Sequence, residues 1–140
     1  MARLDYLDTY ERSFYERLIE NLPTGYTAAM VVNTDLESVQ TMTAPYLKQS
    51  TVILDRNNSS AGGLTSRTEC LHTIQILVDK DSGTAKRGIT DTAKLIMALF
   101  ENTYFEGMYC LEATPEKVGD EPSTNLYRYD ININFYFEGN

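Results

Sequence analysis

The closing stretch of the chain, residues 126–137, reads LYRYDININFYF. Tyrosine, isoleucine or phenylalanine occupies every second position from Tyr127 to Phe137, and the positions between are mostly polar. An alternation with a period of two is typical of a β-strand that buries one face. We therefore predict a strand over Leu126–Phe137 that packs one face on the core, formed by Tyr127, Tyr129, Ile131, Ile133, Phe135 and Phe137.

Two segments have the spacing of amphipathic helices, with apolar residues recurring every three or four positions. The first runs from Leu4 to Leu22 and ends before Pro23; its stripe is Leu4, Leu7, Tyr10, Phe14, Leu18 and Leu22. The second has the stripe Ile89, Ala93, Ile96, Leu99 and Phe100. We expect residues 84–88 to lead into it, Thr90 or Asp91 to cap its start, and the helix to end near Asn102.

The remaining strands are less regular. Residues 47–54 and 67–78 carry β-branched or alternating apolar side chains, which favour strands. Met108–Thr114 reads as a further strand that Pro115 ends, followed by a polar connector over Glu116–Asn125. Residues 28–32 fit a short strand, and residues 36–42 fit either a loop or a short turn of helix.

Together these elements predict an α+β fold in one domain spanning residues 1–140. A mostly antiparallel sheet would pack against two amphipathic helices as a two-layer sandwich. The chain has 140 residues, 42% of them hydrophobic, which is enough for one core without disulfide or metal staples.

Charge excludes several classes of partner. The formal net charge is −8, which argues against binding nucleic acid through its phosphates and against docking on anionic lipid. No apolar run approaches the roughly 20 residues that a membrane span needs. The first residues lead directly into Asp5 and Asp8 without the apolar stretch of a signal peptide, so we expect the protein to be made and assembled in a cytoplasm.

Catalytic and metal-binding patterns are weak. The single histidine, His72, follows Cys70 by two residues, so both would share one face of a strand. With Cys110 they give three zinc ligands at most, and the spacing is not that of a structural zinc site. Neither a nucleophile elbow nor a phosphate-binding lysine loop is present. We therefore expect no enzyme, no metal and no cofactor, and two free thiols.

Interaction surfaces are better represented. The chain has 10 tyrosines and no tryptophan, and tyrosine is enriched at protein contacts. Tyr136 lies on the polar face of the closing strand, which makes it a contact candidate. Residues 55–66 read DRNNSSAGGLTS and predict a long, polar surface loop between two strands.

The order of these elements resembles the tail terminator (tail completion) proteins of long-tailed bacteriophages. The resemblance lies in the Ala44-Pro45-Tyr46-Leu47 entry to a strand, the polar hairpin, and the strand Ile74–Val78 with its Asp81-Ser82-Gly83 turn. It continues through the helix Thr92–Phe100 and the closing strand Leu126–Phe137.

The resemblance implies a virion protein at the junction of tail and head. Such a protein forms a ring, usually a hexamer, that caps the head-proximal end of the tail tube, stops its growth and allows head joining. Its partners would be its own copies, the tail tube protein and a head–neck connector protein, with DNA only as passing cargo and no membrane. The contact candidates are Arg56, Asn57, Asn58, Ser59, Ser60, Gly62, Gly63, Leu64, Arg67 and Tyr136.

Three other functions stay open at this point. The first is a head–neck connector. The second is a small enzyme or ligand-binding domain outside phages, centred on His72, Cys70 and Cys110, and the third is a cytosolic regulatory dimer that forms no ring.

Overall fold

The computed structural model describes residues 2–33, 44–58, 66–121 and 125–139. Two helices and six strands make up most of these ranges, with one turn of 3-10 helix at Ala28–Met30. The elements are α1 (Ala2–Glu20), β1 (Val31–Asn33), β2 (Tyr46–Asn58), β3 (Ser66–Asp79), α2 (Gly83–Phe100), β4 (Tyr104–Phe105), β5 (Met108–Asp120) and β6 (Leu126–Gly139). Neither described helix is long and apolar enough to cross a membrane.

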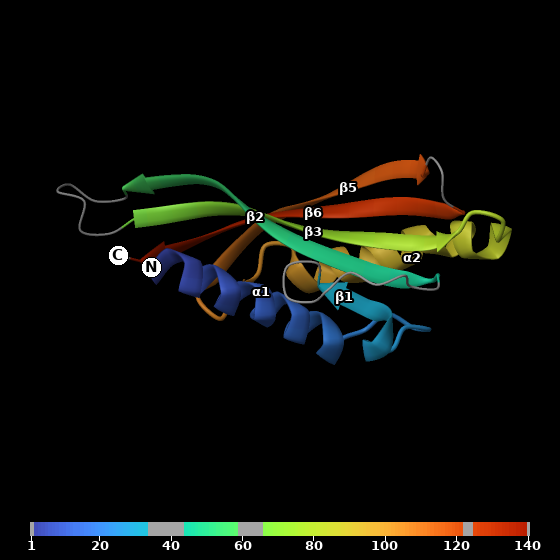
Figure 1. Ribbon diagram of the computed structural model, residues 1–140, viewed down its shortest axis with the longest axis horizontal. Coiled ribbons are helices and arrows are strands. Elements are labelled where there is room, and N and C mark those ends of the chain that lie inside the picture. The colour runs from blue at the N-terminus through green and yellow to red at the C-terminus, as the bar shows by residue number, and fades with distance from the viewer. Residues whose placement is uncertain (1, 34–43, 59–65, 122–124, 140) are drawn as a thin grey trace.

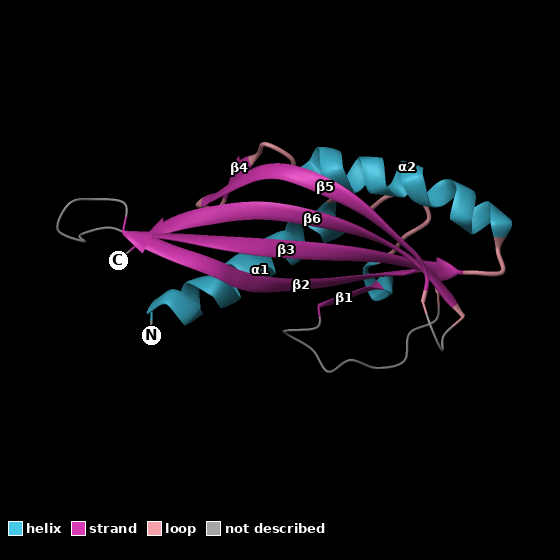
Figure 2. Ribbon diagram, turned by 90° about the horizontal axis from the view of Figure 1, so that it is seen from above, coloured by secondary structure: helices cyan, strands magenta, loops and turns pink. Residues whose placement is uncertain are grey.

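The six strands form one sheet in the order β1-β2-β3-β6-β5-β4. β1 runs parallel to β2, and every other neighbouring pair is antiparallel. Both helices cover the same side of the sheet (Figure 1), and in Figure 2 the strands pass in front of α1. The α+β two-layer prediction is therefore confirmed. Among the described residues, the other side of the sheet carries no helix, and we call it the open face.

The core lies between the sheet and the two helices. The alternating residues of β6 supply its centre, since Ile131, Ile133, Phe135 and Phe137 are at most 2% exposed. From α1 come Phe14 and Leu18, and α2 adds Ile89, Ala93, Ile96 and Phe100. Where side chains are described, the predicted apolar stripe of each helix is thus its buried face, because only the residues of that stripe can contact the apolar side of the sheet.

Helix α2 begins earlier than the sequence predicts. Ser82 is its N-cap, and the Ser82 hydroxyl accepts a hydrogen bond from the Ala85 amide at 3.1 Å. Neither Thr90 nor Asp91 caps the helix; both lie inside it. The prediction was wrong because Gly83 and Gly88 have poor helix propensity, whereas burial of Ile89 and Ala93 on the sheet outweighs that local cost.

Strand β5 does not end at Pro115, contrary to the prediction. It continues to Asp120, and Pro115 is paired with Ile131 of β6. Proline is tolerated in an outer strand, where no neighbour needs its missing N–H. Among the described strands, only the two-residue β4 lies outside β5, and it pairs with Met108 and Tyr109 alone.

The polar hairpin is shorter at its base than predicted. Residues 55–58 belong to β2 and Ser66 begins β3, with Asn58 paired to Ser66. The loop prediction rested on polar side chains, but ladder hydrogen bonds join backbone groups and do not need apolar residues. β3 is also held on its other side by β6 as far as Gly139, which favours pairing along its full length.

The early strand is short. Of the residues 28–32 predicted as a strand, Ala28–Met30 form the 3-10 turn and only Val31 and Val32 are extended, pairing with Leu47 and Lys48 of β2. Residues 36–42 lie outside the described part of the chain.

Candidate interaction surface

The predicted contact residues fall into three groups. Ser59, Ser60, Gly62, Gly63 and Leu64 lie outside the described residues. Arg56, Asn57 and Asn58 form the last residues of β2 and thus lie in a strand, not in a loop. Arg67 and Tyr136 come from neighbouring strands, and the structure brings them into contact.

Arg67 and Tyr136 begin a row of stacked side chains that crosses four strands of the open face. The guanidinium carbon of Arg67 lies 3.7 Å from the Tyr136 ring centroid. Tyr136 stacks on Tyr109 of β5 at 4.8 Å and 11°, and Tyr109 meets Tyr104 of β4 at 4.5 Å. Tyr104 also raises the pKa of Tyr109 above its ordinary value, chiefly through the charge that its nearby hydroxyl would carry. We call this row the tyrosine ladder.

Apolar side chains extend the tyrosine ladder into a larger patch. Leu54 is 57% exposed, Leu111 is 43% exposed and Tyr104 is 61% exposed, and Val52 is also exposed. Large exposed apolar patches on one surface mark sites of protein contact. We call the set of Val52, Leu54, Tyr104, Tyr109, Leu111 and Tyr136 the hairpin-end patch. Sequence reasoning found Tyr136 but missed the leucines, since their exposure depends on strand register.

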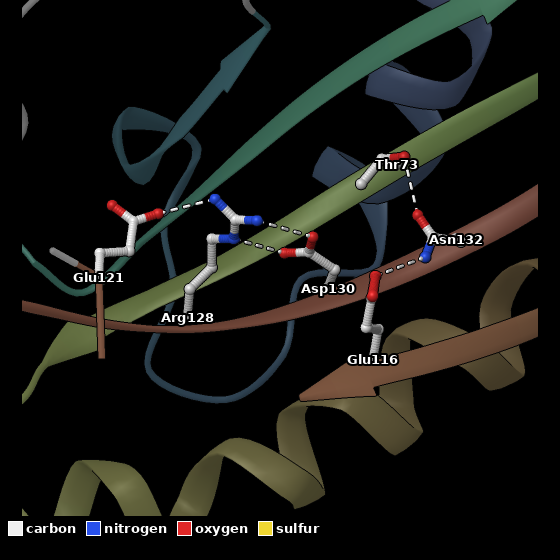
Figure 3. A network of polar contacts seen from close by, with 6 residues as sticks. All are labelled: Thr73, Glu116, Glu121, Arg128, Asp130 and Asn132. Atoms are coloured by element: carbon white, nitrogen blue, oxygen red, sulfur yellow. Dashed lines mark hydrogen bonds and ion pairs between the residues drawn. The ribbon is translucent and has the colours of Figure 1, made fainter. Parts of the chain in front are cut away.

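The opposite end of the open face is charged and internally paired (Figure 3). Arg128 contacts Glu121 at 2.8 Å and Asp130 at 3.0 Å. Burial raises the pKa of Asp130, and the nearby Arg128 only partly offsets this. These side chains pair mainly with one another. We therefore interpret the cluster, which we call the Arg128 clamp, as a structural contact near the start of β6 and not as a ligand site.

A second set of polar contacts adjoins this clamp. The Thr73 hydroxyl donates to Asn132 at 2.9 Å, and the Asn132 amide donates to Glu116 at 3.5 Å. The contacts link β3, β6 and β5 across the open face. They help to fix the register of the three strands, because each bond requires these particular residues to lie opposite one another.

His72 is fully buried and already hydrogen-bonded at both ring nitrogens. Its Nε2 lies 2.8 Å from the side-chain amide oxygen (Oε1) of Gln49, and its Nδ1 lies 2.6 Å from the Thr51 hydroxyl. Because the Gln49 oxygen can only accept, Nε2 carries the proton and Nδ1 accepts from Thr51. The ring also stacks on Phe14 of α1 at 4.0 Å and 11°. This imidazole is a neutral core residue.

The two thiols do not complete a site around His72. Cys70 and Cys110 both pair with Phe135 of β6, from its two opposite sides. Two interstrand spacings of about 4.8 Å each therefore separate them, more than the roughly 4.4–6.8 Å between Cα atoms that a disulfide needs. Burial raises the pKa of each thiol to about 12. Within the described ranges, no three His, Cys, Asp or Glu residues are grouped to hold a metal ion.

The buried imidazole predicts how stability depends on pH. Burial lowers the pKa of His72 to about 3, whereas an unfolded histidine titrates near 6.5. Between these values the unfolded chain binds a proton that the folded chain does not, so the free energy of unfolding falls as pH falls. The expected slope is at most about 1.4 kcal/mol per pH unit.

Urea denaturation at pH 7, 5 and 4 measures this slope. A His72→Gln variant, which cannot titrate, is expected to be less stable at pH 7 but to lose less stability on acidification. The raised pKa of Asp130 acts in the opposite direction in both proteins and so cancels in the comparison. Equal slopes in the two proteins would contradict the assignment of His72.

Comparison with known proteins gives a likeness in structure only. No protein-family model matches the sequence, and no curated protein matches it. Among solved structures, a chain of the virion of a native gene transfer agent particle matches with a TM-score of 0.56. The match covers 92% of this chain and 94% of that chain, at 13% sequence identity. The two chains therefore share a fold over nearly their whole lengths.

Proposed function

We propose that this chain is a structural protein of a bacteriophage-like particle. It forms a ring at the head-proximal end of the tail tube, where it stops tube growth and allows the head to join. The shared fold with a gene transfer agent virion chain, across nearly all of both chains, is the observation that carries the proposal. The resemblance to tail terminator proteins in the order of elements supports the finer role.

The open face supports an assembly role. A ring needs two different surfaces on each subunit that meet head to tail and close by rotation. Such a protein also needs a surface for a different virion protein, and the hairpin-end patch, with aromatic and apolar side chains typical of interface centres, is the candidate for it. In this proposal the subunits contact one another and the tail tube, and the net charge of −8 suits a conduit that lets DNA pass without gripping it.

The proposed role needs no catalytic residue. The alternative of a ligand-binding domain would centre on His72 and the two thiols, but both imidazole nitrogens already have partners and burial keeps the thiols protonated. These contacts favour the structural role. A head–neck connector remains the second candidate, because it needs the same kind of surface.

The test compares particles with and without this protein. We expect assembly in the absence of this protein to give overlong tails that lack heads, because nothing stops the tail tube from growing. The purified protein, added to tail tubes and imaged in negative stain, should cap one end as a ring. Tails of normal length with unjoined heads would instead assign the connector role, and normal particles would exclude both.

A further inference from the structure

Two β-bulges lie at the same level of the sheet, one in each outer long strand. In β2, Ile53 pairs with Cys70 and Asp55 with Glu69, which leaves Leu54 as an extra residue. In β5, Cys110 pairs with Phe135 and Ala113 with Ile133. Because Cys70 pairs with Phe135, both bulges flank one row of the sheet.

The bulges build the walls of a depression on the open face. Leu54 rises on one side, and the bulge residues Leu111 and Glu112 stand opposite Asn134 on the other. Between these walls lie Glu69 and Tyr136 of the two middle strands, in a depression of about 630 Å³. Bulges commonly re-aim side chains beside functional sites, and here two of them act on the same place.

The lining of the depression selects a particular ligand chemistry. Leu54, Leu111 and Tyr136 supply apolar surface, Glu69 and Glu112 supply carboxylates, and Asn102 and Asn134 supply amides. None of the described residues that line it is basic. Glu69 meets Arg67 only at 3.6 Å with both side chains more than a third exposed, and such a pair contributes little.

We propose that the double-bulge depression binds a lysine or arginine side chain presented by an apolar segment of a partner protein. The aliphatic stem lies on Leu54, Leu111 and the edge of the Tyr136 ring, whose two faces are covered by Arg67 and Tyr109. The charged end reaches the carboxylates of Glu69 and Glu112. A second copy of this chain is the poorer occupant, because it brings a net charge of −8 to an acidic rim. The inference deepens the proposed function by stating the chemistry of the virion partner.

Tripeptides provide the test, since they need no knowledge of the partner. The probes are acetyl-Leu-Lys-Leu-amide and the same peptide with norleucine or glutamate in place of lysine. Two-dimensional amide NMR spectra of the full chain follow the binding. We expect the lysine peptide to shift the amides of residues 54, 69, 111, 112 and 136, and Glu112→Gln to weaken its binding about three- to tenfold.

The matched control is Glu116→Gln, which makes the same change on the same strand outside the depression. Its Asn132 contact survives because glutamine keeps an acceptor oxygen. The control should bind the lysine peptide as the unchanged protein does. Leu111→Ser should weaken the lysine and norleucine peptides alike.

Three results would overturn the inference. They are equal binding of the norleucine peptide, binding of the glutamate peptide, or self-association of the protein that Glu112→Gln abolishes. The last would assign the depression to a second copy. The peptide experiment does not measure tail length, so peptides that do not bind would leave the proposed function unaffected. Normal particles in the absence of the protein would contradict the proposed function but would not change the peptide result.

Discussion

Removal of residues 131–140 is expected to leave the chain unfolded. The truncation deletes Ile131, Ile133, Phe135 and Phe137, each at most 2% exposed, from the strand that joins β3 to β5. Full burial of one such side chain contributes about 1.5–3 kcal/mol, so four contribute roughly 6–12 kcal/mol. That is comparable to the whole stability of a typical domain, about 5–15 kcal/mol.

Circular dichroism and thermal unfolding measure the effect. The truncated chain should give no cooperative transition, whereas removal of Gly139 and Asn140 alone should retain one. Gly139 is the last residue of β6 and pairs with Ser66 at the end of the ladder. A cooperative transition in the chain that ends at Asp130 would show that β6 is not the centre of the core.

Phe14→Ala should cost about 3–5 kcal/mol, the largest effect we expect from a single substitution. The Phe14 ring is fully buried and contacts four other rings: His72 at 4.0 Å, Phe135 at 4.8 Å, Phe100 at 5.3 Å and Phe105 at 5.5 Å. Truncation therefore leaves a cavity where both helices meet the sheet. It also removes the ring that covers the face of the His72 imidazole.

Urea denaturation at pH 7 provides the measurement. Glu16→Ala, an exposed change two residues along the same helix, should alter the free energy of unfolding by no more than about 0.5 kcal/mol. A loss below about 1 kcal/mol for Phe14→Ala, well under the usual cost of deleting a core phenylalanine, would mean that α1 packs on the sheet less tightly than the ring contacts indicate.

The sequence predicted those elements whose local pattern and buried face coincide. The alternation of Leu126–Phe137 and the stripe containing Phe14 and Leu18 are such cases, since the same residues that set the period enter the core. It misplaced the start of α2 and the end of β5. Gly83 disfavours helix α2 and Pro115 disfavours strand β5 by local propensity. Only their tertiary neighbours explain why these residues are tolerated there.

The candidate surface was predictable only residue by residue. Arg67 and Tyr136 were each predicted as contacts, but their stacking depends on how β3 pairs with β6. The depression depends on two bulges, which have no clear signal in the residues around Leu54 and Leu111. A shift of one residue in either outer strand turns a side chain to the other face of the sheet, and sequence patterns alone do not fix that register.

Pro115 in β5 has a consequence for the protein before it meets any partner. An exposed strand edge is a template on which further strands can add, and proteins block such templates with proline, bulges and charge. β5 combines all three, since Glu116 and Lys117 follow Pro115 and bulges interrupt both halves of the strand. This edge is therefore protected against the addition of strands from other copies of the chain, which lowers the tendency to aggregate edge to edge.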